Sequence, residues 1–335
     1  MAGRHQDGLN HVIKQIGYHP DYLKEFLGTQ NYLLSGDGPL RYDYRHYIAI
    51  MAAARHQCTC LISHHKQKFA AQGGNIQWLK GLQYIPKKLM NLNEINKILA
   101  HTPWLLKKSH IEKLTKGKDN WSIGELCQAV VLLAHFHCLC SFVFASEILE
   151  HPEECQDTGN NNVVSDIESS EEVAQETVEE LMEKMNGHMS DFIIQDCTWD
   201  DHAYSLLNRF YNDVGTILDE KFKVAYDLTY YTMGHKENVD TTIFRRAVWN
   251  YIHRIYGIIH DDYNYSEMEG LLDYGFRSYV ETVCFCPEKI TKDAHDEIMR
   301  AFRHSEKVHV NLMVFEARFQ AELLYALSAI MRYMT

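Results

Sequence analysis

Residues 41–71 read RYDYRHYIAIMAAARHQCTCLISHHKQKFAA and contain neither glycine nor proline. The run follows Pro39 and ends before the pair Gly73–Gly74, and its alanine, isoleucine, methionine and leucine residues favour helix. Other long segments repeat the three- and four-residue apolar spacing of helices, whereas alternating strand patterns are scarce. The sequence therefore predicts an all-α protein.

Two residues of this run, Cys58 and His65, form a candidate catalytic pair. They are seven positions apart, close to two helical turns, so a continuous helix would place them on one face. An imidazole beside a thiol favours the thiolate, which is the reactive form. If the helix instead breaks at residues 55–57 and restarts at Cys58, the positive end of the second helix would also favour the thiolate. The alternative is that Cys58 is a buried apolar residue and His65 a surface residue.

The overall composition indicates a globular protein kept in a reducing compartment. A chain of 335 residues with 46% hydrophobic residues suits two domains that each bury a core. The cysteines are nine, an odd number, and their spacing matches no disulfide framework. Residues 1–17 lack the apolar core of a secretory signal. We therefore expect a cytoplasmic protein, with the nucleus left open as a second location.

The segment from Gln128 to Ser146 contains no charged residue and is long enough to resemble a membrane span. It follows Ser122 and Glu125, which stand three positions apart as in a capping box at the start of a helix. A buried central helix is therefore the preferred interpretation, and no membrane span is expected.

Negative charge is concentrated in one part of the chain. Residues 147–200 hold sixteen acidic residues and a single lysine, in a protein with a formal net charge of −12. The stretch from Pro152 to Ser170 is also poor in apolar residues, which predicts a mobile acidic linker. We expect an N-terminal helical domain at 1–150, the linker and a linker helix at 151–190, and a C-terminal helical domain at 191–335. The chain has no basic stripe, which argues against nucleic-acid binding.

Three Cys-x-Cys pairs, at 58/60, 138/140 and 284/286, raise the question of a metal site. His135 and His137 precede the middle pair. Residues two apart on a helix point to nearly opposite sides, so each pair is poorly placed to share one ion. Buried core cysteines are the preferred interpretation, and neither a metal nor a cofactor is expected.

The C-terminal part contains the residue types that bind a free amino acid. Such a ligand needs an anion for its ammonium group, a cation for its carboxylate and an apolar cavity for its side chain. Glu306, near the start of a long final helix, Arg245 and several threonines could supply these groups. The alternative is that the threonines cap helices and the charges form a structural ion pair. Likewise, the simplest interpretation of Asp261–Asp262 is a solvated turn between helices.

Several strings resemble the sestrins: YRHYIAIMAAARHQC at 44–58, LAHTPWL at 99–105, HSEKVHVNL at 304–312 and AELLYAL at 321–327. The likeness runs from His19–Pro20 to the final residues 332–335 and fails only in the acidic stretch. It implies an all-α fold of two related helical halves, the first of them similar to the bacterial alkyl hydroperoxide reductase partner AhpD.

One activity implied by the resemblance is that of an alkyl hydroperoxide reductase, a peroxidase of oxidative-stress defence. By position, Cys58 is the thiol that attacks the peroxide and becomes a sulfenic acid, and His65 manages the proton. The second cysteine of the bacterial pair falls at Leu61, the tyrosine of many sestrins falls at Cys60, and the upstream bacterial glutamate falls at His46. Turnover is therefore expected to be slow or to depend on an outside thiol.

The other implied activity is amino-acid sensing. By position, Glu306 holds the ammonium group of leucine and Arg245 its carboxylate, threonines and tyrosines form a lid, and His19 latches the lid by meeting Tyr230. The implied ligand-binding set is His19, Thr229, Tyr230, Tyr231, Thr232, Thr241, Arg245 and Glu306. Met299 and Phe244 stand where the vertebrate leucine sensor has tryptophan and leucine. Loss of a large aromatic wall typically costs ~1 to 3 kcal/mol, so affinity and side-chain selectivity are expected to differ.

The resemblance also implies a protein partner. Sestrins without leucine bind a GATOR subcomplex and so restrain TOR complex 1. By position, Asp261 and Asp262 contact that partner, and Ser122 lies at a second contact while also serving as a helix cap. The leading hypothesis is an inhibitory leucine sensor. The peroxidase is the alternative from another class, and the two can coexist; a helical scaffold that has lost both activities is the third possibility.

Overall fold

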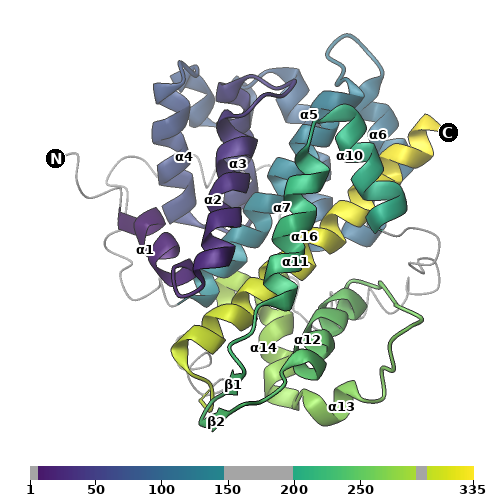
Figure 1. Ribbon diagram of the computed structural model, residues 1–335. Coiled ribbons are helices and arrows are strands. Elements are labelled where there is room, and N and C mark those ends of the chain that lie inside the picture. Colours follow the sequence, from purple (N-terminus) through teal and green to yellow (C-terminus); the bar gives the residue numbers. More distant parts are fainter. Residues whose placement is uncertain (1–6, 147–198, 292–299) are drawn as a thin grey trace.

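The molecule is built from helices that pack around one long C-terminal helix. The computed structural model describes residues 7–146, 199–291 and 300–335. In Figure 1, α16 (His304–Met334) runs diagonally from the small hairpin at one end of the molecule to the C-terminus. It packs along α7 (Ile123–Ala145), and these two helices come from opposite ends of the chain. The prediction of an all-α protein is confirmed.

The elements of each part follow in chain order. The N-terminal part contains α1 (Asp7–Ile16), α2 (Pro20–Ser35), α3 (Tyr42–Arg55), α4 (Thr59–Ala71), α5 (Lys87–His101), α6 (Lys108–Thr115) and α7, with single 3-10 turns at Ile76–Lys80, Leu82–Tyr84 and Pro103–Leu105. The C-terminal part contains a π-helical turn (Trp199–Tyr204), α10 (Ser205–Phe210), α11 (Val214–Asp227), the strands β1 (Thr232–Met233) and β2 (Lys236–Glu237), α12 (Thr242–Ile255), α13 (Met268–Leu271), α14 (Tyr274–Phe285), a 3-10 turn (Pro287–Lys289) and α16.

The long run without glycine or proline is broken once, between α3 and α4. Gln57 adopts a left-handed backbone with φ of 52°, which only a minority of non-glycine residues do. The chain then restarts as α4, and Cys58 is its N-cap residue. The break therefore lies where the sequence allowed it, at residues 55–57, and Cys58 stands at the positive end of α4.

Helix α7 begins with the predicted capping box and continues as a core helix. The Glu125 backbone N–H donates to the Ser122 hydroxyl, and the Ser122 N–H donates to the Glu125 carboxylate. Among the described residues α7 is the one helix long and apolar enough to cross a membrane, but its apolar window is completely buried by other helices. It is therefore a core helix in this structure.

One hydrophobic core extends across both parts of the chain. The ring of Phe315 on α16 meets Phe26 on α2 at 6.3 Å and His135 on α7 at 5.7 Å between centroids. Phe319, one turn further along α16, also lies 5.7 Å from His135. The acidic linker predicted at 152–170 lies outside the described residues.

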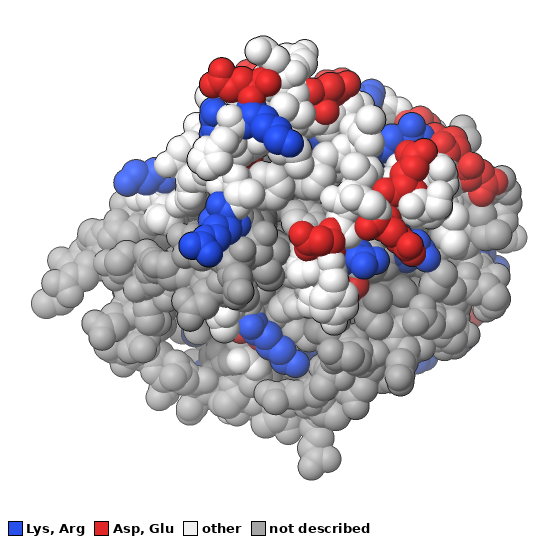
Figure 2. Space-filling model, turned by 90° about the horizontal axis from the view of Figure 1, so that it is seen from below, with Lys and Arg blue, Asp and Glu red and all other residues white. Residues whose placement is uncertain are grey.

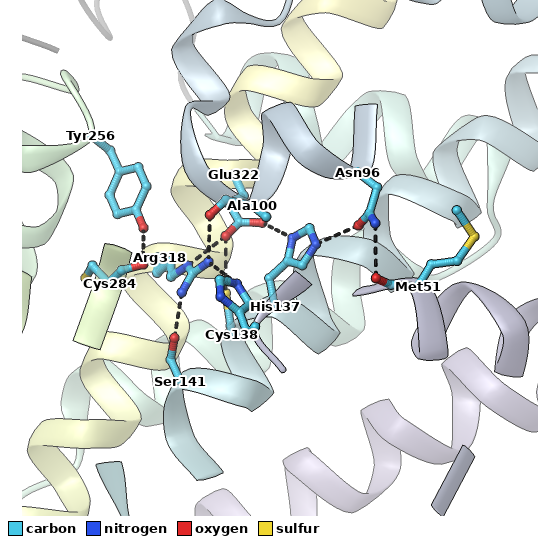
Figure 3. Close-up of polar contacts among 11 residues, drawn as sticks. Met51, Asn96, Ala100, His137, Cys138, Ser141, Tyr256, Cys284, Arg318 and Glu322 are labelled. Carbon is cyan, nitrogen blue, oxygen red and sulfur yellow. Dashed lines mark hydrogen bonds and ion pairs between the residues drawn. The ribbon is translucent and has the colours of Figure 1, made fainter. Parts of the chain in front are cut away.

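A buried polar network also joins α7 and α16 (Figure 3). Arg318 Nε donates to Glu322 Oε1 at 2.7 Å, and the other Glu322 oxygen lies 2.9 Å from His137 Nδ1. His137 Nε2 in turn lies 2.9 Å from Asn96 Oδ1, while the amide nitrogen of Asn96 donates to the carbonyl of Met51. These side chains are completely buried, so each partner satisfies a group that would otherwise be costly to bury.

In the described parts of the chain, His, Cys, Asp and Glu side chains form no cluster of three suited to a metal ion. Three of the four histidines and cysteines in the 135–140 segment instead have other neighbours. His137 belongs to the network of Figure 3, and Cys138 Sγ lies 3.9 Å from Glu322 Oε1. His135 packs between aromatic rings of α2, α7 and α16.

Candidate functional site

A cavity lies between the hairpin, the start of α12 and the start of α16. Its empty volume is about 450 Å³, including the part open to solvent. Seven of the eight residues implied for a leucine site line this cavity. The lining residues are His19, Thr229, Tyr230, Thr232, Met233, Thr241, Phe244, Arg245, Phe302, Glu306, His309, Val310 and Met313. The exception is Tyr231, whose side chain is 61% exposed.

One wall of the cavity comes from the segment 228–241, which contains the hairpin and is called the lid below. Thr232 pairs with Glu237 and Met233 with Lys236, an antiparallel register that no pattern in the sequence indicated. Tyr231 and Asn238 flank the hairpin with φ of 55° and 58°. Gly234 in the turn has φ of 62°, and a Cβ there would lie 2.3 Å from the carbonyl oxygen of Ala301. Only glycine therefore fits this position.

Glu306 ties the lid to the start of α16. Its Oε1 accepts from the Thr232 hydroxyl at 2.8 Å, and its Oε2 accepts from the Gly234 backbone N–H at 2.8 Å. The same Oε2 accepts from the Arg303 backbone N–H at 2.9 Å, which caps the helix. The carboxylate thus holds three donors while lining the cavity.

Arg245, near the start of α12, supplies the positive charge of the cavity and is 6% exposed. Its Nε donates to the Thr241 hydroxyl at 3.2 Å, and one terminal nitrogen donates to the Thr242 hydroxyl at 3.1 Å. The other terminal nitrogen donates to the carbonyl of Tyr226. In the part of the chain that the structure describes, these bonds use three of the five N–H donors of a guanidinium group and leave two without a protein partner.

His19, at the start of α2, reaches the lid from the N-terminal part. Its Nε2 lies 2.7 Å from the carbonyl oxygen of Ser305, so this nitrogen is the donor. The other ring nitrogen then accepts from the Tyr230 hydroxyl, 3.3 Å away. Burial lowers the pKa of His19, and the neutral ring suits this pattern of one donor and one acceptor. The implied contact between His19 and Tyr230 is therefore present.

The remaining wall is largely apolar and comes mainly from residues that the sequence analysis did not single out. His309, Val310 and Met313 follow Glu306 at spacings of three, four and seven along α16, so they share its face. That spacing is the signal that would have found them. Phe244 contributes from α12, its ring 5.7 Å from that of Phe302. Met299 lies outside the described residues.

Comparison with known proteins identifies the family. A family model described as "PA26 p53-induced protein (sestrin)" matches residues 2–191 and 177–334. The chain belongs to the sestrin family. It is 42% identical to mouse Sestrin-1 and 41% identical to human Sestrin-2, in each case over 98% of this chain and 84% of the relative. It is also 39% identical to the Drosophila melanogaster sestrin homolog, over 98% of this chain and 93% of that protein. Membership supports a sestrin-type stress-responsive protein.

The acidic pair of this sestrin is held by the residue that follows the cavity residue Arg245 in α12. Asp261 and Asp262 are exposed, in the loop after α12. Arg246 donates to the carboxylate of Asp262 at 3.1 Å and to its backbone carbonyl at 2.9 Å. Arg246 directly follows Arg245, so one turn of α12 touches both the cavity and the acidic loop. Ser122 is exposed and lies elsewhere, at the start of α7.

Cys58 and His65 occupy a second candidate site in this sestrin, and both are buried. His65 does not hydrogen-bond to Cys58 among the described contacts; its Nδ1 lies 3.0 Å from Nδ1 of His46. Its ring also packs against Phe136 of α7, with 4.6 Å between centroids. Burial lowers the pKa of His65 well below its usual range, so the imidazole is neutral. The structure thus puts His46 beside His65, where the bacterial relatives are implied to carry a glutamate.

Proposed function

We propose that this sestrin is an intracellular sensor of leucine or a related amino acid that binds and inhibits a GATOR subcomplex when empty, and so negatively regulates TOR complex 1. The observation that carries the proposal is that Glu306 and Arg245 line one cavity whose remaining wall is mostly apolar. A carboxylate, a guanidinium group and an apolar wall together complement a zwitterion with an aliphatic side chain.

The contacts of Glu306 and Arg245 indicate how such a zwitterion would bind. Glu306 would accept from the ammonium group, and the two unused donors of Arg245 would bind the carboxylate. The branched side chain of Val310 and the flexible side chain of Met313 offer apolar contacts to the side chain of the ligand. An aliphatic amino acid would therefore be favoured over a charged one, whose side chain would be buried without a partner.

The same contacts link ligand binding to the partner surface. Glu306 holds Thr232 and Gly234 of the lid, and Arg245 holds Thr241 at the base of the lid. A ligand that engages these two charged groups changes what anchors the lid. Arg246, the neighbour of Arg245, holds the acidic loop. We therefore propose that ligand binding alters the position of Asp261 and Asp262.

The first test is thermal unfolding of the purified protein with each of the twenty amino acids. A ligand that binds only the folded state raises the unfolding midpoint. At a concentration one hundred times its Kd, it adds ~2.7 kcal/mol to the free energy of unfolding. We expect a rise with leucine or a close analogue, absent in Arg245→Lys and present in Arg246→Lys. No rise with any amino acid at millimolar concentration would refute amino-acid sensing.

The second test concerns the partner. Purified GATOR subcomplex should be retained by the immobilised protein and released by the amino acid that stabilises it. Asp262→Asn should weaken retention, because the Asp262 side chain is 82% exposed and its carboxylate is available to a partner. Figure 2 shows acidic side chains interspersed with basic ones over the described part of the lower face. Glu269→Gln, an exposed residue of α13, is the matched control. Equal retention of the GATOR subcomplex by both variants would show that Asp262 does not contact this partner.

A peroxidase is the second candidate, and one observation favours it. Cys58 is the N-cap residue of α4, where the positive end of a helix stabilises a thiolate. The purified protein should then consume hydrogen peroxide or an alkyl hydroperoxide in the presence of a dithiol. Cys58→Ser should abolish consumption and Cys60→Ser should not. Activity that survives in Cys58→Ser would rule this candidate out.

A further inference from the structure

A completely buried ion pair joins three helices in the core. Lys221 Nζ of α11 lies 3.0 Å from Glu316 Oε1 of α16, and both side chains are 0% exposed. The Tyr22 hydroxyl of α2 donates to the same carboxylate oxygen. The ammonium group also lies 4.6 Å from the ring centroid of Phe315 and 5.0 Å from that of Phe319. The three polar residues Tyr22, Lys221 and Glu316 are called the core cluster below.

On α2 and α16, a cavity residue lies about one turn from the core cluster. His19, which lines the cavity, is the N-cap residue of α2 and comes three residues before Tyr22. Met313, which also lines the cavity, comes three residues before Glu316 on α16. Residues three apart share one face of a helix, so the core cluster continues the cavity-facing sides of both helices into the core.

Helix α11 connects the core cluster to the lid. Ala225 comes four residues after Lys221, about one turn along the helix, and its carbonyl accepts from His309 Nε2 at 2.9 Å. His309 lines the cavity, and its ring centroid lies 5.6 Å from that of His19. The helix ends directly before the lid and packs against both α2 and α16. The position of α11 against these two helices therefore sets where the lid begins.

The stability of the fold alone does not account for charged groups at this place. Burying an ion pair costs desolvation, and replacing a whole buried pair by apolar residues is often neutral or stabilising. Hydrogen bonds to a carboxylate, however, fix both the distance and the direction of their donors. Glu316 Oε1 thus holds α2 through Tyr22 and α11 through Lys221 at one spacing from α16.

We propose that Tyr22, Lys221 and Glu316 are positioning residues of the amino-acid site, which hold α2 and α11 in the arrangement that lets the lid close on its latch. The proposal rests on the proposed amino-acid sensing. The latch is the contact between Nδ1 of His19 and the Tyr230 hydroxyl, which are 3.3 Å apart. His19 begins α2 and Tyr230 follows the end of α11, so a shift between these two helices would lengthen the latch.

An apolar triple variant, Tyr22→Phe/Lys221→Met/Glu316→Leu, tests the proposal. It removes every polar group of the core cluster together, so no buried charge is left unpaired and the chain should fold. Isothermal titration with leucine should show a roughly tenfold loss of affinity, which corresponds to losing about one hydrogen bond of the latch. Tyr325→Phe, which removes another buried hydrogen bond of α16, is the matched control and should keep the affinity of the unmodified chain. Unchanged leucine affinity in the triple variant would overturn the proposal.

A milder change separates positioning of the latch from a general effect on the fold. Tyr22→Phe removes the arm of α2 and leaves the ion pair of Lys221 and Glu316 in place. It should lower leucine affinity severalfold in the unmodified chain but less than twofold in Tyr230→Phe, where the latch hydroxyl is already absent. Equal losses in the two backgrounds would overturn the proposal, because Tyr22 would then act independently of the latch.

The same titrations separate failure of this inference from failure of amino-acid sensing. If the unmodified chain binds neither leucine nor any other of the twenty amino acids, the sensing proposal is refuted, and the positioning role with it. If the unmodified chain binds leucine and both cluster variants bind it equally well, the sensing proposal stands and the role of the core cluster is refuted.

Discussion

Replacement of Glu306 by glutamine should remove the negative charge that binds the ammonium group of the ligand while leaving the lid in place. The carboxylate has one oxygen bound by the Thr232 hydroxyl and the other by the backbone N–H groups of Gly234 and Arg303. In Glu306→Gln, the amide oxygen can accept from both N–H groups, and the amide nitrogen can donate to the Thr232 hydroxyl, which is able to accept as well as donate. Glutamine is also an accepted residue at this helix position.

The expected effect of Glu306→Gln is a loss of leucine affinity. A hydrogen bond to a charged group contributes ~1.5 to 3 kcal/mol, so Glu306→Gln should weaken leucine binding by roughly 10- to 150-fold. The free energy of unfolding without ligand should change by less than ~1 kcal/mol, because the three lid contacts are retained. Glu306→Ala, in contrast, leaves those three donors without their partner and should destabilise the ligand-free protein as well.

Isothermal titration calorimetry gives the affinity, and urea unfolding gives the ligand-free stability. Glu237→Gln is the matched control, since Glu237 lies on the same hairpin, is exposed and does not line the cavity. Leucine affinity in Glu306→Gln equal to that of the control would refute the assignment of Glu306 to the ammonium group. A large loss of ligand-free stability would instead refute the proposed exchange of hydrogen bonds.

Three further predictions concern stability. Glu322→Gln should cost ~3 to 5 kcal/mol in urea unfolding, because its amide can keep the hydrogen bonds to Arg318 and His137 but leaves the completely buried Arg318 guanidinium without a counterion; Glu322→Ala, which also removes the hydrogen bonds, should cost at least as much. Burial lowers the pKa of His309 to about 4, so as the pH falls the unfolded chain binds a proton on this residue before the folded chain does. The contribution of His309 to the free energy of unfolding should be complete above about pH 6.5 and should decline toward pH 4. His309→Gln should reduce this dependence of unfolding free energy on pH. Ser122→Ala should cost ~1 kcal/mol of unfolding free energy and Ser122→Asp almost nothing; equal losses would contradict the capping role.

Features with a helical period or a capping pattern were predictable from the sequence. The all-α class, the uncharged α7 with its Ser122–Glu125 box and the long final helix all follow from local residue preferences, which act over one or two turns. The break before Cys58 was one of two alternatives, because residues 55–57 contain neither glycine nor proline, and the left-handed Gln57 decided it.

Features that depend on contacts between distant segments were not predictable in this way. Two-residue strands are too short to show alternation, and the hairpin depends on Gly234 meeting Ala301. Seven of the eight residues assigned to the leucine site by resemblance line one cavity, whereas Tyr231 is exposed beside it.

The length of α16 has a practical consequence for experiments on separate halves. Glu306 and Glu322 are sixteen residues apart, or ~24 Å along one helix, so a single rigid element carries the lid anchor and the acidic partner of His137. A fragment made of residues 7–146 would lose the helix that packs along α7 and would expose a largely apolar surface. We expect such a fragment to aggregate and to recover solubility only when co-expressed with residues 199–335, so activities of the two halves are best separated by point substitution.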